Sequence, residues 1–423
     1  MGIVYIIFFT FFIVLYHCKT LNYAHSPYES TSNIFDVRVL GAIGDGVADD
    51  TQAFVTAWGY ACQSQSSTVL VPKGYTFMVK SIIFAGPCQF GLNFEIEGVI
   101  VPPDGPESWT KNTSFRKWLV FFRANGLIVS GDGVIDGRGE KWWSLPCKPH
   151  RGINGTTLPG PCDSPTSLRF LSTSNVTVHG IRVQNSPQFH IRFDNCRNVI
   201  VDNITINSPA LSPNTDGIHI SNSESVGIYN SLISNGDDCV SIGSGTINLF
   251  IQNLTCGLGH GISIGSLGKN NSHASVTNIT VKDSFIRQSH NGVRIKTWQG
   301  GTGNVSAVTF KNIYVDTVRN PIIIDQYYCD CLIKCANQSQ AVSISDITYS
   351  NIKGTYNVKS PPVYLGCSES MPCTNITLDN VVLFPSNKEH DTFNFPFCWN
   401  AYGDSSQSVI PKVTCLQHAF PPS

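Results

Sequence analysis

The sequence predicts an all-β chain: a right-handed parallel β-helix, or solenoid of stacked coils, with a short N-terminal capping helix. A six-residue pattern returns along the chain, with two alternating apolar residues and a final Asn, Gly or Asp, as in NVTVHG from residue 175 and NITVKD from residue 278. Alternation with period two is typical of strands that bury one face. No amphipathic helix of useful length separates the copies, which argues against a βα or leucine-rich solenoid.

The spacing of the copies indicates one coil for each repeat. Successive copies between residues 175 and 307 begin 23, 27, 23, 30 and 29 residues apart, and a second short strand pattern follows each copy. A single coil cannot bury its own apolar face, so such coils stack and form a continuous core. The Asn residues that recur at the strand ends are expected to form ladders at the turns.

The segment 44–62, GDGVADDTQAFVTAWGYAC, departs from this pattern. Asp49 or Asp50 is a suitable N-cap residue, and apolar residues follow with helical spacing. These apolar residues are Phe54, Val55 and Trp58. We expect a helix that covers the open end of the solenoid, where unpaired strand edges would otherwise promote aggregation.

We expect one β-helix domain over residues 36–415. A Pro- and Trp-rich insertion at 140–162 is too long for a turn and is expected to shape a rim of this domain. Before the domain, an apolar run from Gly2 to Tyr16 is too short for a membrane span and is typical of a signal peptide. We expect residues 1–24 to be removed, although no Lys or Arg precedes the run and no clean cleavage site follows it. An uncleaved anchor is the alternative.

The cysteines and sequons indicate a secreted glycoprotein. Loss of Cys18 would leave fourteen of the fifteen cysteines, an even number that suits disulfides in an oxidising compartment. Cys329, Cys331 and Cys335 favour disulfides over a metal site, because no histidine or matching CxxC pair lies nearby. Ten N-x-S/T sequons are present, at Asn112, Asn154, Asn175, Asn203, Asn253, Asn270, Asn278, Asn304, Asn337 and Asn375.

Charge is scarce: 13% of the residues are charged, and the net charge is −1. No overall field attracts nucleic acid, and nucleic acid is not expected as a partner. An anionic partner would have to be held by locally placed cations.

Alignment of successive coils produces a column of functional side chains. DGIHI at 216–220, DCVSI at 238–242 and HGISI at 260–264 begin 22 residues apart, and NGVRI follows at 291–295. Asp216, Asp238 and His260 are therefore expected to stack, about 4.8 Å apart, with Asp237 beside them.

Alternation along these strands separates a core face from a solvent face. The apolar residues expected inside are Ile218, Ile220, Val240, Ile242, Ile262, Ile264, Val293 and Ile295. The polar residues expected outside are His219, Ser241, Ser263, Arg294 and Lys296. Acid–base hydrolysis of a glycoside needs two carboxyl groups, and crowded carboxyls acquire different pKa values. Isolated aspartates such as Asp194, Asp283 and Asp379 are interpreted as turn formers, and His219 has the alternative of bonding only to a neighbouring loop.

Four ordered motifs resemble the signature motifs of the polygalacturonases, which are pectin-degrading glycoside hydrolases with a right-handed β-helix. The motifs are SPNTDGIHI (212–220), GDDCVSIGSG (236–245), CGLGHGISIGS (256–266) and RIKTW (294–298). The resemblance runs from RVLGAIGDGVADDTQAF to about residue 380 and is closest in style to the plant branch.

The resemblance implies hydrolysis of α-1,4-galacturonosyl linkages in pectin with inversion at the anomeric carbon, without a cofactor or metal. It implies that Asp237 is the general acid, that Asp216 and Asp238 hold and activate water, and that His260 tunes the acid. Its implied substrate-binding residues are Arg294 and Lys296, which would grip a galacturonate carboxylate, with Asn214 and Tyr328. His219, which alternation places on the same face, is a further candidate for substrate binding. Tyr327 is the alternative to Tyr328, and Cys239 and Cys256 form a plausible disulfide.

Other functions remain open at this stage. A rhamnogalacturonan hydrolase could share the fold and acids, although the Arg294-x-Lys296 pair suits a uronate. A pectate lyase would need a calcium cluster and an arginine base, and a silent wall-binding protein would usually have lost an acid or the histidine. We expect a secreted, monomeric, endo-acting enzyme of the plant cell wall that remodels pectin and has no stable membrane association; exo action is the alternative.

Overall fold

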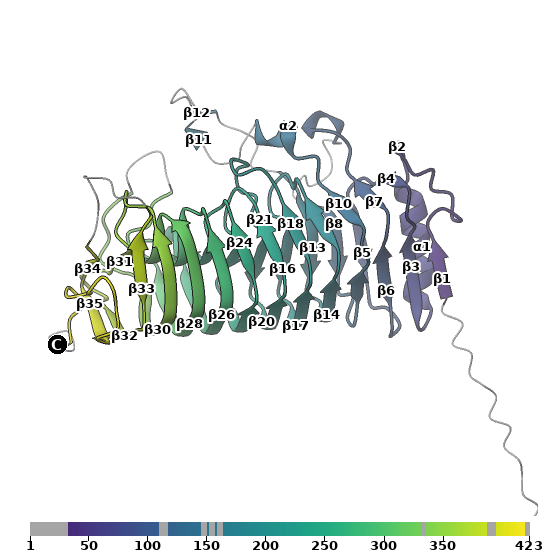
Figure 1. Cartoon of the computed structure of the whole chain (residues 1–423). Coiled ribbons are helices and arrows are strands. Elements are labelled where there is room, and N and C mark those ends of the chain that lie inside the picture. Colours follow the sequence, from purple (N-terminus) through teal and green to yellow (C-terminus); the bar gives the residue numbers. More distant parts are fainter. Residues whose placement is uncertain are drawn as a thin grey trace, which may run out of the picture. The chain divides into compact units, whose positions relative to one another are not determined.

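The chain winds through coils of three strands, and equivalent strands of successive coils pair in parallel to form a right-handed parallel β-helix (Figure 1). The computed structural model describes residues 33–109, 117–144, 150–151, 157–158, 164–330, 335–386 and 395–418. The expected signal peptide at 1–24 lies outside these residues. Within them, no helix is both long and apolar enough to cross a membrane.

Three stacks of strands run along the helix. The first contains β1 (Asn33–Asp36), β3 (Ser67–Val71), β6 (Asn93–Ile96), β9 (Ile128–Ser130), β14 (Ser174–His179), β17 (Arg197–Asp202), β20 (Glu224–Tyr229), β23 (Thr246–Gln252), β26 (His273–Arg287), β28 (Thr302–Val318), β30 (Ser343–Tyr356), β32 (Cys373–Asp379) and β35 (Ala401–Ser405). The second contains β2 (Asp45–Asp49), β4 (Thr76–Met78), β7 (Val99–Val101), β10 (Val134–Asp136), β15 (Arg182–Gln184), β18 (Thr205–Asn207), β21 (Leu232–Ser234), β24 (Thr255–Gly257), the later parts of β26, β28 and β30, and β33 (Val382–Pro385).

The third stack is a separate parallel sheet, and it carries the predicted column. Its strands are β5 (Ile82–Ala85), β8 (Lys117–Phe122), β13 (Thr166–Leu171), β16 (Ile191–Asp194), β19 (Ile218–Ser221), β22 (Val240–Ile242), β25 (Ile262–Leu267), β27 (Asn291–Thr297), β29 (Asn320–Asp325), β31 (Val363–Gly366) and β34 (Phe397–Trp399). All eight side chains predicted to face the core from β19, β22, β25 and β27 are buried.

The repeat in the sequence matches the observed register of the first stack. The first apolar residue of each copy pairs with its equivalent in the next coil: Val176, Val199, Val226, Leu249, Ile279, Val308, Ile347 and Ile376 lie in one row. Each of these residues is buried, because the period-two pattern turns it into the common core.

Asparagine side chains form ladders between coils, near the starts of β14 and β17 and at the predicted place after the ends of β20 and β23. Asn198 donates to Asn175 at 3.0 Å, and Asn253 donates to Asn230 at 2.9 Å in a second ladder. All four residues have positive φ, a conformation that Asn tolerates better than most residues. The Asn repeat therefore reflects both a backbone requirement and a side-chain bond between coils. Asp283, also at positive φ, accepts bonds from Gln252 and Asn312, as its interpretation as a turn residue predicts.

The N-terminal helix α1 (Thr51–Gln63) packs against β1, β3 and β5. Phe54 and Trp58 are buried as predicted, whereas Val55 is exposed because it lies on the outer side of the helix. Asp50 occupies the N-cap position but makes no side-chain capping bond. Its carboxylate instead accepts the backbone N–H groups of Ile43 and Gly44, at 2.6 and 3.2 Å.

The insertion at 140–162 is described only in part. It contains α2 (Glu140–Trp143) and the antiparallel pair β11 (His150–Arg151) and β12 (Thr157–Leu158). Two short 3₁₀ turns complete the elements, η1 (Pro106–Ser108) and η2 (Lys269–Asn271). The expected rim formed by the insertion stays a prediction.

Disulfides link ten of the cysteines in the described residues, as Cys62–Cys88, Cys239–Cys256, Cys329–Cys335, Cys367–Cys373 and Cys398–Cys415. The predicted Cys239–Cys256 bridge is confirmed. The even count of cysteines after Cys18 does not mean that all of them are paired, because the Cys196 thiol is free and buried. Burial raises the pKa of this thiol to about 11. Cys147, Cys162 and Cys331 lie outside the described residues.

Candidate active site

Each of three neighbouring strands in the third stack is preceded, two positions earlier, by a predicted site residue. These residues are Asp216 before β19, Asp238 before β22 and His260 before β25. Ile218 pairs with Val240, and Val240 pairs with Ile262, so the residues two positions earlier follow one another in the same order. Backbone bonds keep this alignment in the turns: Gly217 N–H donates to Asp238 O at 2.9 Å, and His260 N–H donates to Asp237 O at 2.8 Å. The column predicted from 22-residue spacing is present.

Asp238 is held by three donors. Ser263 Oγ and Arg294 Nη2 both donate to its Oδ1 at 2.7 Å, and Lys296 Nζ donates to Oδ2 at 2.8 Å. Burial alone would raise the pKa of Asp238, but the charges of Lys296 and Arg294 outweigh burial and lower it. Asp238 therefore remains a carboxylate, and both cations, which would be solvated on an ordinary strand face, are drawn into the protein.

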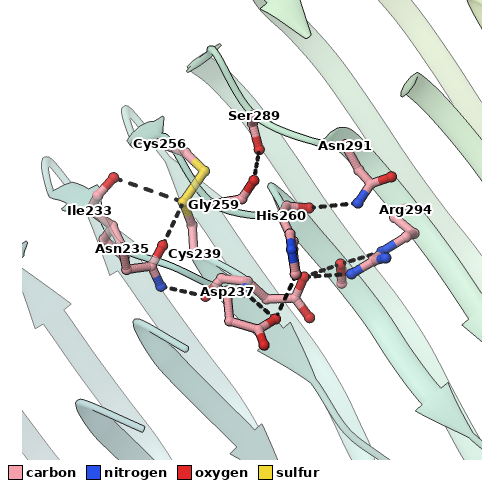
Figure 2. Close-up of a disulfide and its surroundings, with 12 residues drawn as sticks. Ile233, Asn235, Asp237, Cys239, Cys256, Gly259, His260, Ser289, Asn291 and Arg294 are labelled. Atoms are coloured by element: carbon pink, nitrogen blue, oxygen red, sulfur yellow. Dashed lines mark hydrogen bonds and ion pairs between the residues drawn. A yellow bond between two sulfur atoms is a disulfide. The ribbon is translucent and has the colours of Figure 1, made fainter. Parts of the chain in front are cut away.

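Asp237 lies at the edge of this group and contacts His260. His260 Nδ1 is 2.8 Å from Asp237 Oδ1, and the same oxygen accepts the N–H of Asp238 at 2.8 Å. Figure 2 shows the Asp237 carboxylate and the His260 ring turned toward each other, beside the Cys239–Cys256 disulfide. Because Oδ1 accepts a backbone N–H, a proton on this carboxyl group belongs on Oδ2.

Asp216 is buried and has a pKa raised well above the usual value. Burial is the main cause, and the charges of Asp237 and Asp238 add to it, while a bond from Ser241 and the charge of Lys296 act in the opposite direction. Asp216 and Asp238 are thus neighbouring carboxyls whose pKa values are displaced in opposite directions, a common feature of acid–base sites.

His219 is a neutral residue that packs within the wall of the site. Its Nδ1 is 2.8 Å from Ser241 Oγ in the next coil, and its ring stacks on Phe189 with centroids 4.7 Å apart. Burial lowers the pKa of His219 to about 3. The partner of His219 is thus a residue of the neighbouring strand β22 and not the neighbouring loop of the alternative, and its expected contact with substrate stays a prediction.

The structure separates the two candidate tyrosines. Lys296 Nζ lies 5.4 Å from the ring centroid of Tyr328, and the ring packs edge-on against Trp298. Tyr327 instead directs its hydroxyl to the backbone oxygen of Cys367, at 3.1 Å. The geometry favours Tyr328 as the site tyrosine. Asn214 is buried with positive φ, two residues before Asp216.

Three residues of the site could together hold a cation. Ligand atoms of Asp237, Asp238 and His260 all lie within 4.8 Å of one another. Both oxygens of Asp238 are already bonded to Arg294 and Lys296, however, and these charges would repel a metal ion. The donor set therefore fits calcium poorly, since calcium takes six to eight oxygen ligands.

Sequence reasoning placed Ser263 on the face of the site but gave it no role, and it missed His290. Ser263 bridges Asp238 and Arg294 Nε, the latter at 2.9 Å, and His290 stacks on His260 with ring centroids 5.0 Å apart. Burial, and secondly the neighbouring His260, lower the pKa of His290. The signal for Ser263 was available, because it lies one register step from Arg294 on the same face.

The interpretation of Asp194 as a turn former is wrong. Asp194 is buried at the end of β16 and accepts bonds from Arg169 Nε at 2.7 Å, Arg192 Nε at 2.9 Å and Ser221 Oγ at 2.7 Å. Side chains alternate along a strand, so Asp194 and Arg192 point to the same side of β16. An alignment of HIRFD at 190–194 with later coils could therefore have indicated this cluster.

The fold and the site together define a glycoside hydrolase of the β-helix type. The chain belongs to glycosyl hydrolases family 28, whose family model matches residues 62–403, and within it to the polygalacturonases. The protein "Probable polygalacturonase At1g80170" of Arabidopsis thaliana is 45% identical over 395 residues, covering 93% of this chain and 86% of its own. The "Polygalacturonase" of Cryptomeria japonica is 42% identical over 393 residues, covering 93% and 74%.

Solved structures agree with the fold. An endo-xylogalacturonan hydrolase from Aspergillus tubingensis matches with a TM-score of 0.71 at 24% identity, over 86% of this chain and 99% of its own. A hyperthermoactive exopolygalacturonase from Thermotoga maritima matches with a TM-score of 0.70 at 20% identity, over 83% and 87%. At such identities these structures support the architecture.

Proposed function

We propose that this chain hydrolyses α-1,4-galacturonosyl linkages of polygalacturonate in pectin, with inversion and with endo action. The observation that carries the proposal is the group of three aspartates and His260 on adjacent coils, beside two cations that can receive a uronate. The names of the relatives point to the same substrate.

Asp237 acts as the general acid. It protonates the glycosidic oxygen from Oδ2, while His260 and the Asp238 N–H hold Oδ1. A general acid of this kind contributes roughly 10²–10⁴-fold to the rate.

Asp216 and Asp238 hold the attacking water on the other face of the sugar, as inversion requires. Asp238 is ionised through its bonds to Arg294 and Lys296. The raised pKa of Asp216 makes its ionised form the stronger base of the two. The proton of the water therefore passes to this pair as the bond to the anomeric carbon forms.

Arg294 and Lys296 bind the carboxylate of a uronate next to the cleaved bond. Each uses one donor on Asp238, and both groups carry further N–H donors that can reach a ligand. Tyr328 packs against Lys296, and we assign Asn214 and His219 to the walls of the same cleft.

Endo action is proposed because the outward row of the third stack continues on both sides of the acids. It runs back to Arg192 and Arg169 and forward to Ile323 and Tyr364. We further propose that residues 1–24 are removed, that residues 36–415 form the catalytic domain, and that the monomer is secreted to the cell wall to remodel pectin. The five disulfides support an oxidising compartment.

The test is digestion of polygalacturonic acid by the wild type and by Asp237→Asn, with analysis of product sizes over time. We expect mixed saturated oligomers from the wild type and a loss of about 10²–10⁴-fold in rate for the variant. Activity near wild type in Asp237→Asn would refute the assigned acid.

The same digestion separates the alternatives. Monomer as the only early product would indicate exo action, and preference for rhamnogalacturonan would indicate the related hydrolase. Unsaturated products that disappear with a chelator would indicate a lyase. Inactivity of the folded wild type on all these substrates would leave a wall-binding protein.

A further inference from the structure

A second cation–carboxylate cluster lies on the same strand face, outside the site described above. It consists of Asp194, Arg169, Arg192 and Ser221, and we call it the Asp194 cluster. Asp194 Oδ2 contacts Arg169 Nε at 2.7 Å and Arg192 Nε at 2.8 Å, so one carboxylate serves two guanidinium groups. The cluster therefore keeps a net positive charge.

The two arginines have donors left for a ligand. The side chains of Arg169 and Arg192 are 18% and 30% exposed, and the bonds to Asp194 use only Nε of each. Among the described residues, the Nη groups of both arginines have no hydrogen-bond partner. A guanidinium fixed through Nε presents its Nη groups in the paired geometry that suits a carboxylate.

The cluster is continuous with the active site. Arg169 pairs with Arg192, Arg192 with His219, and His219 with Ser241, whose strand follows Asp238 directly. Arg192 is thus two strand steps, about 10 Å, from the Asp238 strand, and Arg169 is three steps, about 14 Å.

An apolar surface joins the two places. The Arg192 guanidinium carbon lies 5.6 Å from the ring centroid of Phe189, and Phe189 stacks on His219. Phe189 and His219 are partly exposed, and His219 lies between Arg192 and Ser241 in the strand register, so the stacked pair offers a floor beside the arginines. A sugar ring can rest on such a floor while its charged substituent reaches a guanidinium.

We propose that Arg169 and Arg192 bind carboxylates of a polyuronate chain, two to three sugar units from the cleaved bond, on the opposite side from Arg294 and Lys296. This inference rests on the proposed function and extends its substrate site along the third stack. Asp194 acts as a positioning residue, because it fixes both guanidinium groups without contacting the substrate.

The competing explanation is that the arginines only neutralise the buried Asp194. In that case their loss would reduce stability and leave the dependence on substrate length unchanged. A carboxylate subsite predicts a different result. Its removal should raise KM only for oligomers that are long enough to reach the subsite.

The experiment measures kcat and KM on saturated galacturonate oligomers of increasing length, for the wild type, Arg192→Gln and Arg169→Gln. We expect near wild-type kinetics on the shortest cleaved oligomer and a KM about tenfold higher on long ones, since a hydrogen bond to a charged group is worth about that factor or more. The rise in KM should begin at a shorter oligomer in Arg192→Gln than in Arg169→Gln, because Arg192 lies nearer the aspartates of the active site.

Two controls complete the test. Arg182→Gln changes an exposed arginine on β15, in another stack, and should match the wild type at every length. If Arg192→Gln does not fold, Arg192→Lys, which keeps the charge beside Asp194, and Arg169→Gln take its place. Equal KM at all lengths in folded variants, or a loss independent of length, would overturn the inference. Failure of the wild type to cut any galacturonate oligomer would instead overturn the proposed function.

Discussion

The third stack carries two clusters that are built alike but placed differently. In the Asp194 cluster, a carboxylate accepts bonds from two arginines and from Ser221; in the Asp238 cluster, which we define as Asp238, Arg294, Lys296 and Ser263, it accepts bonds from two cations and a serine. In both, the serine lies in the following coil. The same arrangement, two cations and a serine of the next coil, thus surrounds both buried aspartates on the polar face of the third stack.

The difference lies in the neighbours. Asp238 stands beside Asp237 and Asp216, whereas the residues packed around Asp194 add only the positive charge of the two arginines. The Asp238 side chain is 2% exposed and the Asp194 side chain 10%, so both are well buried. Burial and partners are thus similar in the two clusters, and only Asp238, where we propose that the reaction takes place, has further carboxyls beside it. We therefore attribute the proposed catalysis to the neighbouring carboxyl groups and not to the ion pairs, which both clusters share.

The largest expected effect concerns activity. Asp238→Asn should lower kcat on polygalacturonate by about 10²–10⁴-fold, because it removes a proposed base. Asp194→Asn should lower kcat less than tenfold and raise KM, since it disturbs only the orientation of the arginines. Steady-state kinetics at a temperature where both variants are folded provides the measurement. Equal kcat losses in the two variants would contradict the distinction between the clusters.

The two clusters also show what could be predicted from this sequence. The column of Asp216, Asp238 and His260 followed from equal spacing, since the coils repeat in step with the sequence. Asp194 was misassigned because its partners, Arg169 and Arg192, lie 25 and 2 residues away in coils that carry no signature motif. Strand periodicity gives the face of a residue, but a salt bridge between coils depends on side-chain reach.

Other features lay beyond any pattern in the sequence. Tyr328 was preferred to Tyr327 in the sequence, but the contacts that separate them, Tyr328 with Lys296 and Tyr327 with the backbone oxygen of Cys367, required the structure. The direction of the pKa shifts likewise required burial and distances. Asp216 and Asp238 occupy equivalent positions in the sequence, and only their surroundings shift their pKa values in opposite directions.

A second prediction tests whether the close placement of Asp216, Asp237 and Asp238 lowers the stability of the fold. Asp216→Asn should inactivate the enzyme and yet raise its free energy of unfolding at neutral pH, by the usual size of a single stabilising substitution, about 0.5–2 kcal/mol. The reason is that burial and two neighbouring carboxylates oppose the ionised form of Asp216.

The pH dependence gives this prediction its control. The unfolded Asp216 ionises near pH 3.9, and the folded one at a higher pH, so its stability cost is absent below about pH 3.9, grows as the pH rises, and is constant above the folded pKa. Thermal melts of the two proteins should therefore nearly coincide at low pH and diverge toward neutral pH. A constant offset would show that packing, and not charge, causes the difference.

The smallest effects expected on activity belong to the two serines. Ser221→Ala and Ser263→Ala each remove a donor to a buried carboxylate, at a cost of about 1–2 kcal/mol in chemical or thermal unfolding. Each loss also raises the pKa of the carboxylate, because a hydrogen bond to the charged form is gone. The consequence differs between the clusters.

For Asp194, whose pKa is lowered in the fold, stability is present above about pH 3.9 and is lost as the pH falls through the folded pKa. Ser221→Ala should therefore begin to lose stability at a higher pH than the wild type, with the pH profile of kcat unmoved. Ser263→Ala should show that change and also move the acidic limb of the kcat profile to higher pH, because Asp238 must be ionised to act. A shift of the kcat profile in Ser221→Ala would instead place Asp194 in the chemistry, and the two clusters would then form one extended site.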